Sequence, residues 1–545
     1  MSSWCETKMN NIKILDCTLR EAPLEKLMWG TSAIRKILDG LHNARIDIIE
    51  VGFLKNEVYQ MGSTSFQKVE EIKPYLLNKD KNITYVALVD YGRYDIKNLS
   101  DYDGESIDAI RVCFKHSEID DVLAYAQKIR EKGYNVCIQH VDTMGYTDEE
   151  ISSFIDKINE FSPLAYSIVD TFGAMYSDEL LHFVAMVSEK LDKNIMLGLH
   201  VHNNLLLADA NVQTFVQMLG GERRIIVDAS LYGCGRGAGN AHTELVAQYI
   251  NKKYSGNYDV DEILDLIDTV INVAQQKTNW GYTIPYFISG MYNAHTFNVK
   301  HLLKRHNIKS RDLRAIIEKL DEKKKKEYDY QLLDKLYIEY FDRYVDDDDA
   351  IDSLKRIFGE KKVLFLGPGE TVRTKKDDIV SFIYQNNPII IGINNIIDGY
   401  KLDYLFCSSS IRYHNLKYQD IEMCGEPKLI LTSNIVDESK TNEILVNYSS
   451  LIQPGWVNVD SSFILAIRLL IRCGIFEVYI AGMDGYRDFG TSFYKNELDT
   501  NLDKESRDLS TEDNISMLKD IISHYPQFRM HFLTETVYSE VTESK

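Results

Sequence analysis

Roughly the first 300 residues alternate between short apolar runs and amphipathic helical stretches. Segments such as residues 178–191 have apolar residues that recur at helical spacing. The apolar runs have the length and composition of buried strands and cover residues 12–19, 46–53, 83–90, 107–114, 134–141, 164–171, 195–202 and 224–231. Eight β-then-α units in about 250 residues predict a closed (β/α)8 TIM barrel, in which chemistry takes place at the carboxyl ends of the strands.

Polar side chains occur at the carboxyl ends of six of these runs. In GLHVHNN, residues 198–204, two histidines project from one face of an extended strand, because side chains alternate along it. Each polar residue alone is also consistent with a helix cap or a loop salt bridge. Their coincidence at one rim predicts a functional site formed by Asp16, Glu50, Asp90, His140, Asp170 and the pair His200 and His202.

The composition changes after about residue 300. Residues 304–344 have the pattern of charged helices, and VDDDDA, 345–350, is typical of a linker. Strand-like runs then resume at 361–370, 387–395, 402–410, 427–435 and 477–486, with an apolar helix at 463–474. This alternation predicts a second, open α/β sheet whose ligands bind beyond the strand ends. We therefore expect a barrel domain at 1–295, a helical extension and charged linker at 296–350, and a Rossmann-like domain at 351–545.

Composition and charge exclude several classes of function. With 44% hydrophobic residues and 34 tyrosines, the chain is typical of a globular protein. Its net charge of -20 disfavours binding to nucleic acid or to anionic membranes. The eight cysteines form no CxxC pair, and the first ten residues lack the layout of a signal peptide. We expect free thiols and a soluble, cytoplasmic protein.

Four motifs resemble one family of barrel enzymes. DCTLRE (16–21), IDIIEVGF (46–53), GLHVHNN and the glycine-rich DASLYGCGRGAGN (228–240) are similar, in this order, to the family of 4-hydroxy-2-oxovalerate aldolase, HMG-CoA lyase and 2-isopropylmalate synthase. The last motif is most similar to the 4-hydroxy-2-oxoacid aldolase branch. The resemblance implies a class II, metal-dependent lyase that joins or cleaves a 2-oxoacid such as pyruvate and an aldehyde through a metal-stabilised enolate.

The resemblance also implies roles for particular residues. Asp16, His200 and His202 would hold a divalent metal, with manganese expected first and magnesium, cobalt or zinc as alternatives. Arg20 would stabilise the charge that develops on the substrate's carbonyl oxygen.

The chain departs from the family pattern after Arg20. Family members commonly read LRDG, with a histidine shortly afterwards in the oxovalerate aldolases, whereas this chain reads LREAPLEKLMWG. No histidine in this segment is available as a general base, which leaves the aldehyde partner open. Candidates for the base are Glu21, His140 and one tyrosine among Tyr282, Tyr286 and Tyr292, with Tyr286 preferred.

The loop GCGRGAGN, residues 233–240, follows the eighth predicted strand, where barrels often bind phosphate through backbone N–H groups. A tight return of the chain is an equally good interpretation of its glycines. Arg236 within the loop favours an anionic substrate.

The C-terminal half resembles a second group of proteins. LGPGE (366–370), PIIIGINN (388–395) and IAGMDGY (480–486) are similar to the Rossmann-like domains of bacterial sialyltransferases and of the pterin diphosphokinase-like family. The resemblance implies that Gly367, Gly369, Asn394, Asn395 and Asp484 line a pocket for a nucleotide or nucleotide-sugar. The two domains together would then act in sugar or cell-surface glycan metabolism.

Two alternatives stay open. The barrel is also consistent with an inactive scaffold that supports a nucleotide-sugar-binding or glycosyltransferase-like C-terminal domain, or with a Claisen-type acyl-CoA synthase. In each case we expect small-molecule partners, no nucleic acid or membrane, and a homodimer.

Overall fold

The computed structural model describes residues 11–21, 27–77, 79–278, 280–305, 307–416, 418, 425–435, 443–486 and 504–543. The chain divides into two compact units. Unit 1 comprises residues 1–299 and 320–328, and unit 2 comprises residues 300–319 and 329–545. The short segment 320–328 therefore belongs with the barrel, although it is flanked in sequence by residues of unit 2.

Unit 1 contains a closed barrel of eight parallel strands, which confirms the predicted TIM barrel. The strands follow one another around the barrel, and pairing of the first with the second and with the last closes it. They are β1 (Ile12–Asp16), β2 (Ile48–Leu54), β4 (Thr84–Asp90), β5 (Ala109–Phe114), β6 (Asn135–His140), β7 (Ala165–Asp170), β8 (Met196–Val201) and β9 (Ile225–Ala229), with the two-residue strand β3 (Ser65–Phe66) added beside β2.

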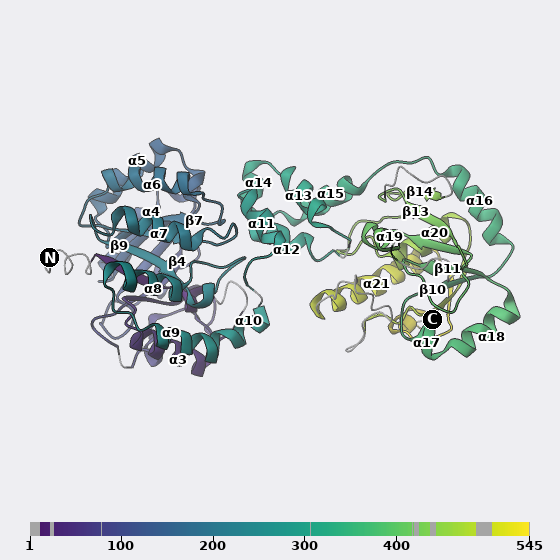
Figure 1. Cartoon of the computed structure of the whole chain (residues 1–545), viewed down its shortest axis with the longest axis horizontal. Helices are drawn as coiled ribbons and strands as arrows, with labels where there is room; N and C mark the ends of the chain where they lie inside the picture. Colours follow the sequence, from purple (N-terminus) through teal and green to yellow (C-terminus); the bar gives the residue numbers. More distant parts are fainter. Residues whose placement is uncertain are drawn as a thin grey trace. The chain divides into compact units, whose positions relative to one another are not determined.

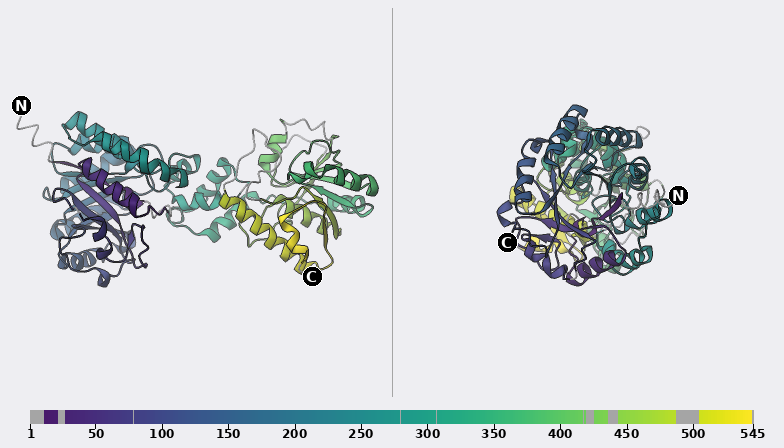
Figure 2. Two further views of the ribbon diagram at one scale, coloured as in Figure 1. Left: turned by 90° about the horizontal axis from the view of Figure 1, so that it is seen from below. Right: turned by 90° about the vertical axis from the view of Figure 1, so that its left-hand side faces the viewer.

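Helices surround these strands, as the right-hand view of Figure 2 shows. They are α2 (Thr18–Glu21), α3 (Thr31–Asn43), α4 (Val122–Glu131), α5 (Asp148–Phe161), α6 (Ser177–Lys190), α7 (Ala208–Leu219), α8 (Thr243–Tyr254), α9 (Val260–Leu266) and α10 (Asn272–Thr278), and the chain continues into α11 (Ile284–Met291) and α12 (Thr296–Leu302). The apolar faces of α2 to α10 and the outer faces of the strands form one large hydrophobic core.

The inner faces of the strands form a separate, smaller cluster of apolar residues. Its members occupy alternate positions of the strands and include Ile48, Ala109, Cys137, Met196 and Ile226. Because side chains alternate along a strand, the residues two and four positions further along also point into the barrel. The polar residues that share this inner row are therefore placed at the carboxyl end of the barrel.

Unit 2 opens with a group of helices that pack on its own sheet domain. They are α13 (Ser310–Glu318), α15 (Tyr330–Phe341) and α16 (Asp348–Gly359), and α14 (Glu322–Lys326) belongs to the segment returned to unit 1. Tyr337 of α15 donates a hydrogen bond to Asp460 Oδ2 at 2.7 Å. In the acidic run before α16, Asp347 is buried and pairs with Arg472 at 2.6 Å.

The second sheet has seven strands, all parallel, in the order β14-β13-β12-β11-β10-β15-β16. This confirms the predicted second α/β sheet (Figure 1). The strands are β10 (Val363–Leu366), β11 (Ile389–Ile393), β12 (Tyr404–Cys407), β13 (Lys428–Thr432), β14 (Ile444–Val446), β15 (Glu477–Ala481) and β16 (Arg529–Phe532). The pattern of the sequence had not indicated β14 and β16.

Helices cover both faces of this sheet. They are α17 (Thr371–Thr374), α18 (Lys376–Asn386), α19 (Ser410–Leu416), α20 (Ser462–Arg472), α21 (Lys504–His524) and α22 (Glu540–Glu543). Phe382 of α18 packs on Tyr479, with ring centroids 4.7 Å apart. Phe358 of α16 packs on Tyr404 at 5.6 Å. The strand register places Tyr479 beside Ile390 in the row of Leu364, and Tyr404 beside Ile391, so the two helices lie on opposite faces.

The order of the strands creates a switch point between β10 and β15. From β10 the chain proceeds outward through β11 to β14, and from β15 it proceeds in the other direction to β16. Open α/β sheets bind ligands beyond the carboxyl ends of the strands at such a point. The glycine turns that follow β10 and β15 meet there.

Two further expectations can be compared with the fold. Within the described segments, the cysteines Cys17, Cys113, Cys137, Cys234, Cys407 and Cys473 are free thiols, as predicted, while Cys5 and Cys424 lie outside those segments. No helix of the described residues combines the length and apolar character needed to cross a membrane.

Candidate metal site at the carboxyl end of the barrel

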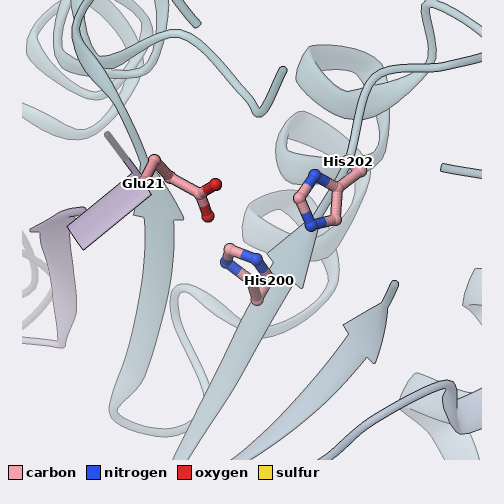
Figure 3. A group of neighbouring side chains, drawn as sticks. All are labelled: Glu21, His200 and His202. Atoms are coloured by element: carbon pink, nitrogen blue, oxygen red, sulfur yellow. The ribbon is translucent and has the colours of Figure 1, made fainter. Parts of the chain in front are cut away.

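Three buried side chains form a cluster of metal-ligand type in unit 1. Glu21, His200 and His202 each offer one ligand atom, and these atoms lie within 4.8 Å of one another. Figure 3 shows the carboxylate of Glu21 and the two imidazole rings pointing toward one another. Glu21 ends the single helical turn α2 that follows β1, His200 lies in β8, and His202 directly follows that strand. The cluster therefore lies at the rim where barrel enzymes carry out their chemistry.

Strand geometry explains why both histidines take part. Met196 of β8 points into the barrel, so His200 and His202, at even intervals from it, point the same way. Gly198 lies between Met196 and His200 in this row, and a Cβ there would approach Ser167 Oγ to 2.2 Å. The glycine thus lets β8 pack closely against β7 below the histidines. The two rings are 5.1 Å apart and nearly perpendicular, at 88°.

A chain of buried ion pairs joins Glu21 to His200 through the barrel interior. It runs, in order, through Glu21, Arg20, Glu50, Arg111, Asp228 and His200. All six side chains are at most 5% exposed. Burial of so many charges is tolerated only because each has an oppositely charged or hydrogen-bonding partner.

The distances along this chain are those of good hydrogen bonds. Arg20 Nε donates to Glu50 Oε2 at 2.7 Å, and Arg111 Nη1 donates to Glu50 Oε1 at 3.1 Å. Arg20 also bonds to Glu21, and Arg111 also bonds to Asp228. A single glutamate in β2 therefore holds both guanidinium groups in fixed orientations.

Asp228 completes the chain by contacting His200. Its Oδ2 lies 3.1 Å from His200 Nδ1. Burial alone would raise the pKa of Asp228, but the charge of Arg111 and the hydrogen bond from His200 hold that pKa below its ordinary value. A carboxylate on one ring nitrogen of a histidine orients the ring and leaves the other nitrogen available as a ligand.

Asp16, predicted as the third ligand, lies elsewhere. Leu15 points into the barrel, so Asp16 points outward toward the helices. Its two carboxylate oxygens accept hydrogen bonds from the N–H of Thr18 at 2.9 Å and from Thr243 Oγ1 at 2.6 Å. Burial raises the pKa of Asp16 to about 6. The structure thus groups Glu21, rather than Asp16, with the histidines, and a ligand role for Asp16 stays a prediction.

The predicted proton-transfer groups are dispersed. Glu21 is part of the cluster. His140 is buried between the sheet and the helices, where its Nδ1 lies 2.8 Å from Tyr166 Oη and its ring packs against Tyr146. Tyr286 lies half-buried in the first turn of α11.

Three of the five residues predicted to bind a nucleotide, Gly367, Gly369 and Asp484, lie together at the switch point of the sheet of unit 2. A Cβ on Gly367 would lie 2.5 Å from Gly482 O, and one on Gly369 would lie 2.4 Å from Asp484 Cγ, so these glycines let two turns pack together. Asp484 accepts a hydrogen bond from the N–H of Thr371 at 3.0 Å. The remaining two, Asn394 and Asn395, follow β11, and Asn394 Oδ1 accepts from the N–H of Ser408 at 3.1 Å.

Sequence analysis missed Arg111 and Asp228, and it gave Glu50 no role beyond its place at the rim. The available signal was a lone charged residue inside an apolar strand, as in IDAIRVCF and RIIVDASL. Lys, Arg, Asp and Glu are almost never fully buried unless they are paired. Such residues therefore indicate a buried ion-pair network, but they do not identify the partners.

The closed parallel barrel defines a (β/α)8 protein, and its carboxyl end carries two histidines and a carboxylate that could hold a metal ion. Residues 11–271 match the family model described as HMGL-like. This part of the chain is therefore an HMGL-like domain, which confirms the family resemblance of the barrel.

Individual relatives are similar over about half of the chain. The 4-hydroxy-2-oxovalerate aldolase of Bacillus thuringiensis (strain Al Hakam) is 24% identical over 318 residues, covering 55% of this chain and 89% of the relative. The oxaloacetate decarboxylase of Mycobacterium tuberculosis is 25% identical over 297 residues, covering 53% and 84%. The crystal structure of HMG-CoA lyase from Brucella melitensis is 16% identical, with a TM-score of 0.40, and covers 49% of this chain and 99% of that one.

The burial of His140 predicts a pH dependence of stability. Burial, followed by the nearby His116, lowers the pKa of His140 to about 3, whereas a histidine in an unfolded chain titrates near about 6.5. The contribution of His140 to the free energy of unfolding is thus complete above pH 6.5. It is lost as the pH falls toward 3, because in this range the unfolded chain binds a proton at His140 and the folded chain does not.

Between pH 6.5 and 4 we expect the free energy of unfolding of the native protein to fall more steeply than that of His140→Gln, by about 1.4 kcal/mol per pH unit. Melting curves at a series of pH values provide the comparison. The test compares the slopes of the free energy of unfolding against pH, so a lower absolute stability of the variant does not affect the comparison. Parallel slopes would show that His140 is protonated in the folded state.

Proposed function

We propose that unit 1 is a class II aldolase, a divalent-metal-dependent lyase that makes or breaks a C–C bond between a 2-oxoacid such as pyruvate and an aldehyde. The observation that carries this proposal is the buried cluster of Glu21, His200 and His202 with the guanidinium of Arg20 beside it. The names of the relatives, an aldolase and a decarboxylase of 2-oxoacids, support it. Retro-aldol cleavage and loss of carbon dioxide from oxaloacetate leave the same enolate.

The residues at the cluster fit a divalent cation. Two imidazoles and one carboxylate suit manganese, magnesium, cobalt or zinc, and we retain manganese as the first expectation. Among the described residues, the buried atoms His202 Nδ1 and Asn240 Oδ1 have no hydrogen-bond partner. Glu21, His200 and His202 would hold the ion, which acts as a Lewis acid on the carbonyl group of the substrate.

Arg20 is prepared to stabilise negative charge. Its Nε and Nη1 are fixed by Glu50 and Glu21, while its buried Nη2 has no partner within the described part of the chain. A donor held in this way needs no reorganisation when charge develops on a substrate oxygen. We propose that Nη2 of Arg20 donates a hydrogen bond to the substrate oxygen that gains negative charge as the enolate forms.

The charge of the site matches a 2-oxoacid. The ion-pair chain contains three carboxylates and two guanidinium groups, so its net charge is one negative. With a divalent cation the net charge becomes one positive, equal and opposite to the single carboxylate of a 2-oxoacid. Charges that are both buried and balanced are far less costly than an unpaired one.

Of the predicted proton-transfer groups, Tyr286 is the one that we retain. Glu21 serves as a ligand in this proposal, and His140 lies outside the barrel interior. Tyr286 lies on α11, which follows the barrel strands in the sequence. Its hydroxyl group is able to exchange a proton with the substrate.

The choice between Glu21 and Asp16 as third ligand is testable by metal analysis. Glu21→Gln keeps the size of the side chain but removes a charged ligand, so we expect it to lose bound manganese. Asp16→Asn keeps an acceptor for Thr18 and should bind the metal as the native protein does. Inductively coupled plasma mass spectrometry after dialysis measures the content. Metal loss in Asp16→Asn alone would restore Asp16 as the ligand.

Enolisation provides a test that requires no knowledge of the aldehyde. The metal-loaded protein in deuterium oxide should exchange the methyl protons of pyruvate, followed by NMR. Arg20→Lys retains a positive charge but loses the planar fork. We expect its exchange rate to fall by about one hundredfold or more with the metal retained, as when a single oxyanion donor is lost. A native protein that binds metal but exchanges no protons would favour the inactive scaffold or the acyl-CoA synthase.

For unit 2 we propose a nucleotide or nucleotide-sugar site beyond β10, β11 and β15, which would place the aldolase in sugar or cell-surface glycan metabolism. The supporting observations are the switch point of the sheet and the guanidinium group of Arg412 at the same edge. Arg412 of α19 follows β12 and is half-buried, and burial lowers the pKa of its guanidinium although Tyr486 acts to raise it. A desolvated arginine of this kind suits a phosphate group.

Calorimetric titration of the full chain with uridine diphosphate, cytidine monophosphate and their sugar conjugates tests this site. Arg412→Gln should weaken the binding by about tenfold or more. Arg356→Gln, on the exposed face of α16, is the matched control and should bind as the native chain does. Absence of binding across the panel would mean that unit 2 has another role. The cytoplasmic location and the homodimer stay predictions.

A further inference from the structure

Asp90 is a carboxylate at the rim of the barrel that takes no part in the ion-pair chain. It is the last residue of β4. Val86 of this strand belongs to the inner apolar cluster, so Asp90, four positions further along, also points into the barrel. Its side chain is 34% exposed and forms an ion pair with Arg93 at 3.4 Å. An exposed pair of this kind contributes little to stability, so the carboxylate is able to leave Arg93 for a substrate.

The order of the strands places Asp90 across the mouth of the barrel from the histidines. Counted from β1, β4 is the third of the eight strands around the barrel, and β8, which carries His200, is the seventh. The two strands are therefore diametrically opposite. The interior of an eight-stranded barrel is just wide enough for side chains to fill. A small molecule bound at the mouth is thus able to contact β4 and β8 at the same time.

The thiol of Cys113 is within electrostatic range of both Asp90 and Arg20. Cys113 of β5 is in register with Asp90, and Ala109 of the same strand belongs to the inner cluster, so Cys113 also points inward. Burial, and then the charge of Asp90, raise the pKa of Cys113 to about 12, while the charge of Arg20 acts to lower it. Asp90 and Arg20 therefore border the same part of the barrel mouth.

The wall of the mouth beside Asp90 is apolar. The inward-facing residue before Asp90 in β4 is Leu88, and an irregularity of β2 brings Phe53 into register with Leu88. Both side chains are buried. The opposite wall carries the two histidines and their carboxylate partner in β9. Pyruvate has its chelating oxygens at one end and its methyl group at the other. With the oxygens at the cation, the methyl group faces the apolar wall and Asp90.

The other inward-facing ionisable groups at the carboxyl ends of the described strands have different tasks. The thiols Cys17 and Cys113 are protonated at neutral pH, because burial raises the pKa of each of them. His202 belongs to the triad. The remaining members belong to the ion-pair chain and are Glu50, Arg111, Asp228 and His200. Within these strands, Asp90 is the carboxylate that is left for proton transfer.

We propose that Asp90 is the catalytic base that removes a proton from the methyl carbon of the 2-oxoacid. This inference rests on the proposed aldolase function and adds the residue that forms the enolate. The proton passes from the carbon to the carboxylate of Asp90. The electron pair of the broken C–H bond forms the carbon–carbon double bond of the enolate, and the carbonyl oxygen gains the negative charge beside Arg20.

The aldol reaction then moves two protons with two separate groups. The enolate carbon forms a bond to the aldehyde carbon, and the aldehyde oxygen takes up a proton, for which Tyr286 stays the proposed donor. In the cleavage direction Asp90 returns its proton to the enolate carbon. Because Asp90 is partly exposed, its proton exchanges with solvent, which makes its action visible as deuterium exchange into pyruvate.

Two reactions that form the same enolate separate proton removal from substrate binding. Asp90→Asn keeps the size of the side chain but removes the base. In the manganese-loaded full chain we expect deuterium exchange into pyruvate to fall by about one hundredfold or more, as for a lost general base. Loss of carbon dioxide from oxaloacetate forms the enolate without proton removal, so its protein-catalysed rate should stay nearly unchanged. Metal content and calorimetric binding of oxalate, which has the chelating oxygens of the enolate, should equal those of the native protein.

A base supplied from solution provides an independent measurement. Asp90→Ala leaves space for a small carboxylate where the side chain was. Added formate should restore part of the exchange rate in Asp90→Ala and leave the rate of the native protein unchanged.

Asp101→Asn is the matched control. Asp101 follows the same strand, is exposed, and pairs at 3.5 Å with Lys132, which precedes β6 at the opposite end of the barrel. The variant removes the same charge without changing the rim. It should exchange the protons of pyruvate at the native rate, and an equal loss in both variants would attribute the effect to overall charge and overturn the proposal.

The results distinguish the two proposals. Exchange at the native rate in Asp90→Asn would overturn the role of Asp90 and leave the aldolase proposal intact. Equal losses of exchange and decarboxylation, or loss of oxalate binding, would show that Asp90 holds the substrate and would overturn its role as a base. Decarboxylation without exchange in the native protein would keep the enolate chemistry but show that no group of the site removes the proton. If the native protein does neither, the aldolase proposal fails and the inference fails with it.

Discussion

The site at the rim of the barrel depends on the buried ion-pair chain that crosses its interior. Glu50 of β2 holds both Arg20 and Arg111, and through them it orients the carboxylate of Glu21 and, by way of Asp228, the ring of His200. Each of these charges would be very costly to bury alone, and their mutual pairing offsets that cost. The same pairing fixes side chains from four strands and one helical turn relative to one another before any substrate binds.

The alternation of side chains along a strand decides which polar residues can belong to this network. Glu50, Arg111, Asp228 and the two histidines share the inner row with the small apolar cluster that fills the barrel below them. Asp16 and His140 are as close to the carboxyl ends of their strands, but they point to the helices and bond there. A shift of one position along a strand therefore separates a site residue from a packing residue.

The fold could be predicted from the sequence to a large extent. All eight barrel strands, and five strands of the second sheet, appear as apolar runs bounded by polar or glycine-rich turns. The two missed strands, β14 and β16, have three and four residues, and exposed side chains interrupt their apolar pattern. Pairing with β13 and with β15 forms them, and this long-range interaction leaves no periodic signal in so short a segment.

The sequence by itself determined the pair His200 and His202, because their spacing along one strand fixes a common direction. Only the tertiary structure decided their third partner and the residues that orient them. Glu21 reaches the histidines because α2 turns the chain back over the barrel mouth, and Arg111 meets Asp228, 117 positions away in the sequence, because the barrel closes. The sequence pattern predicts that the barrel closes, but local patterns of hydrophobic and polar residues do not encode which of the inward side chains then meet across its interior.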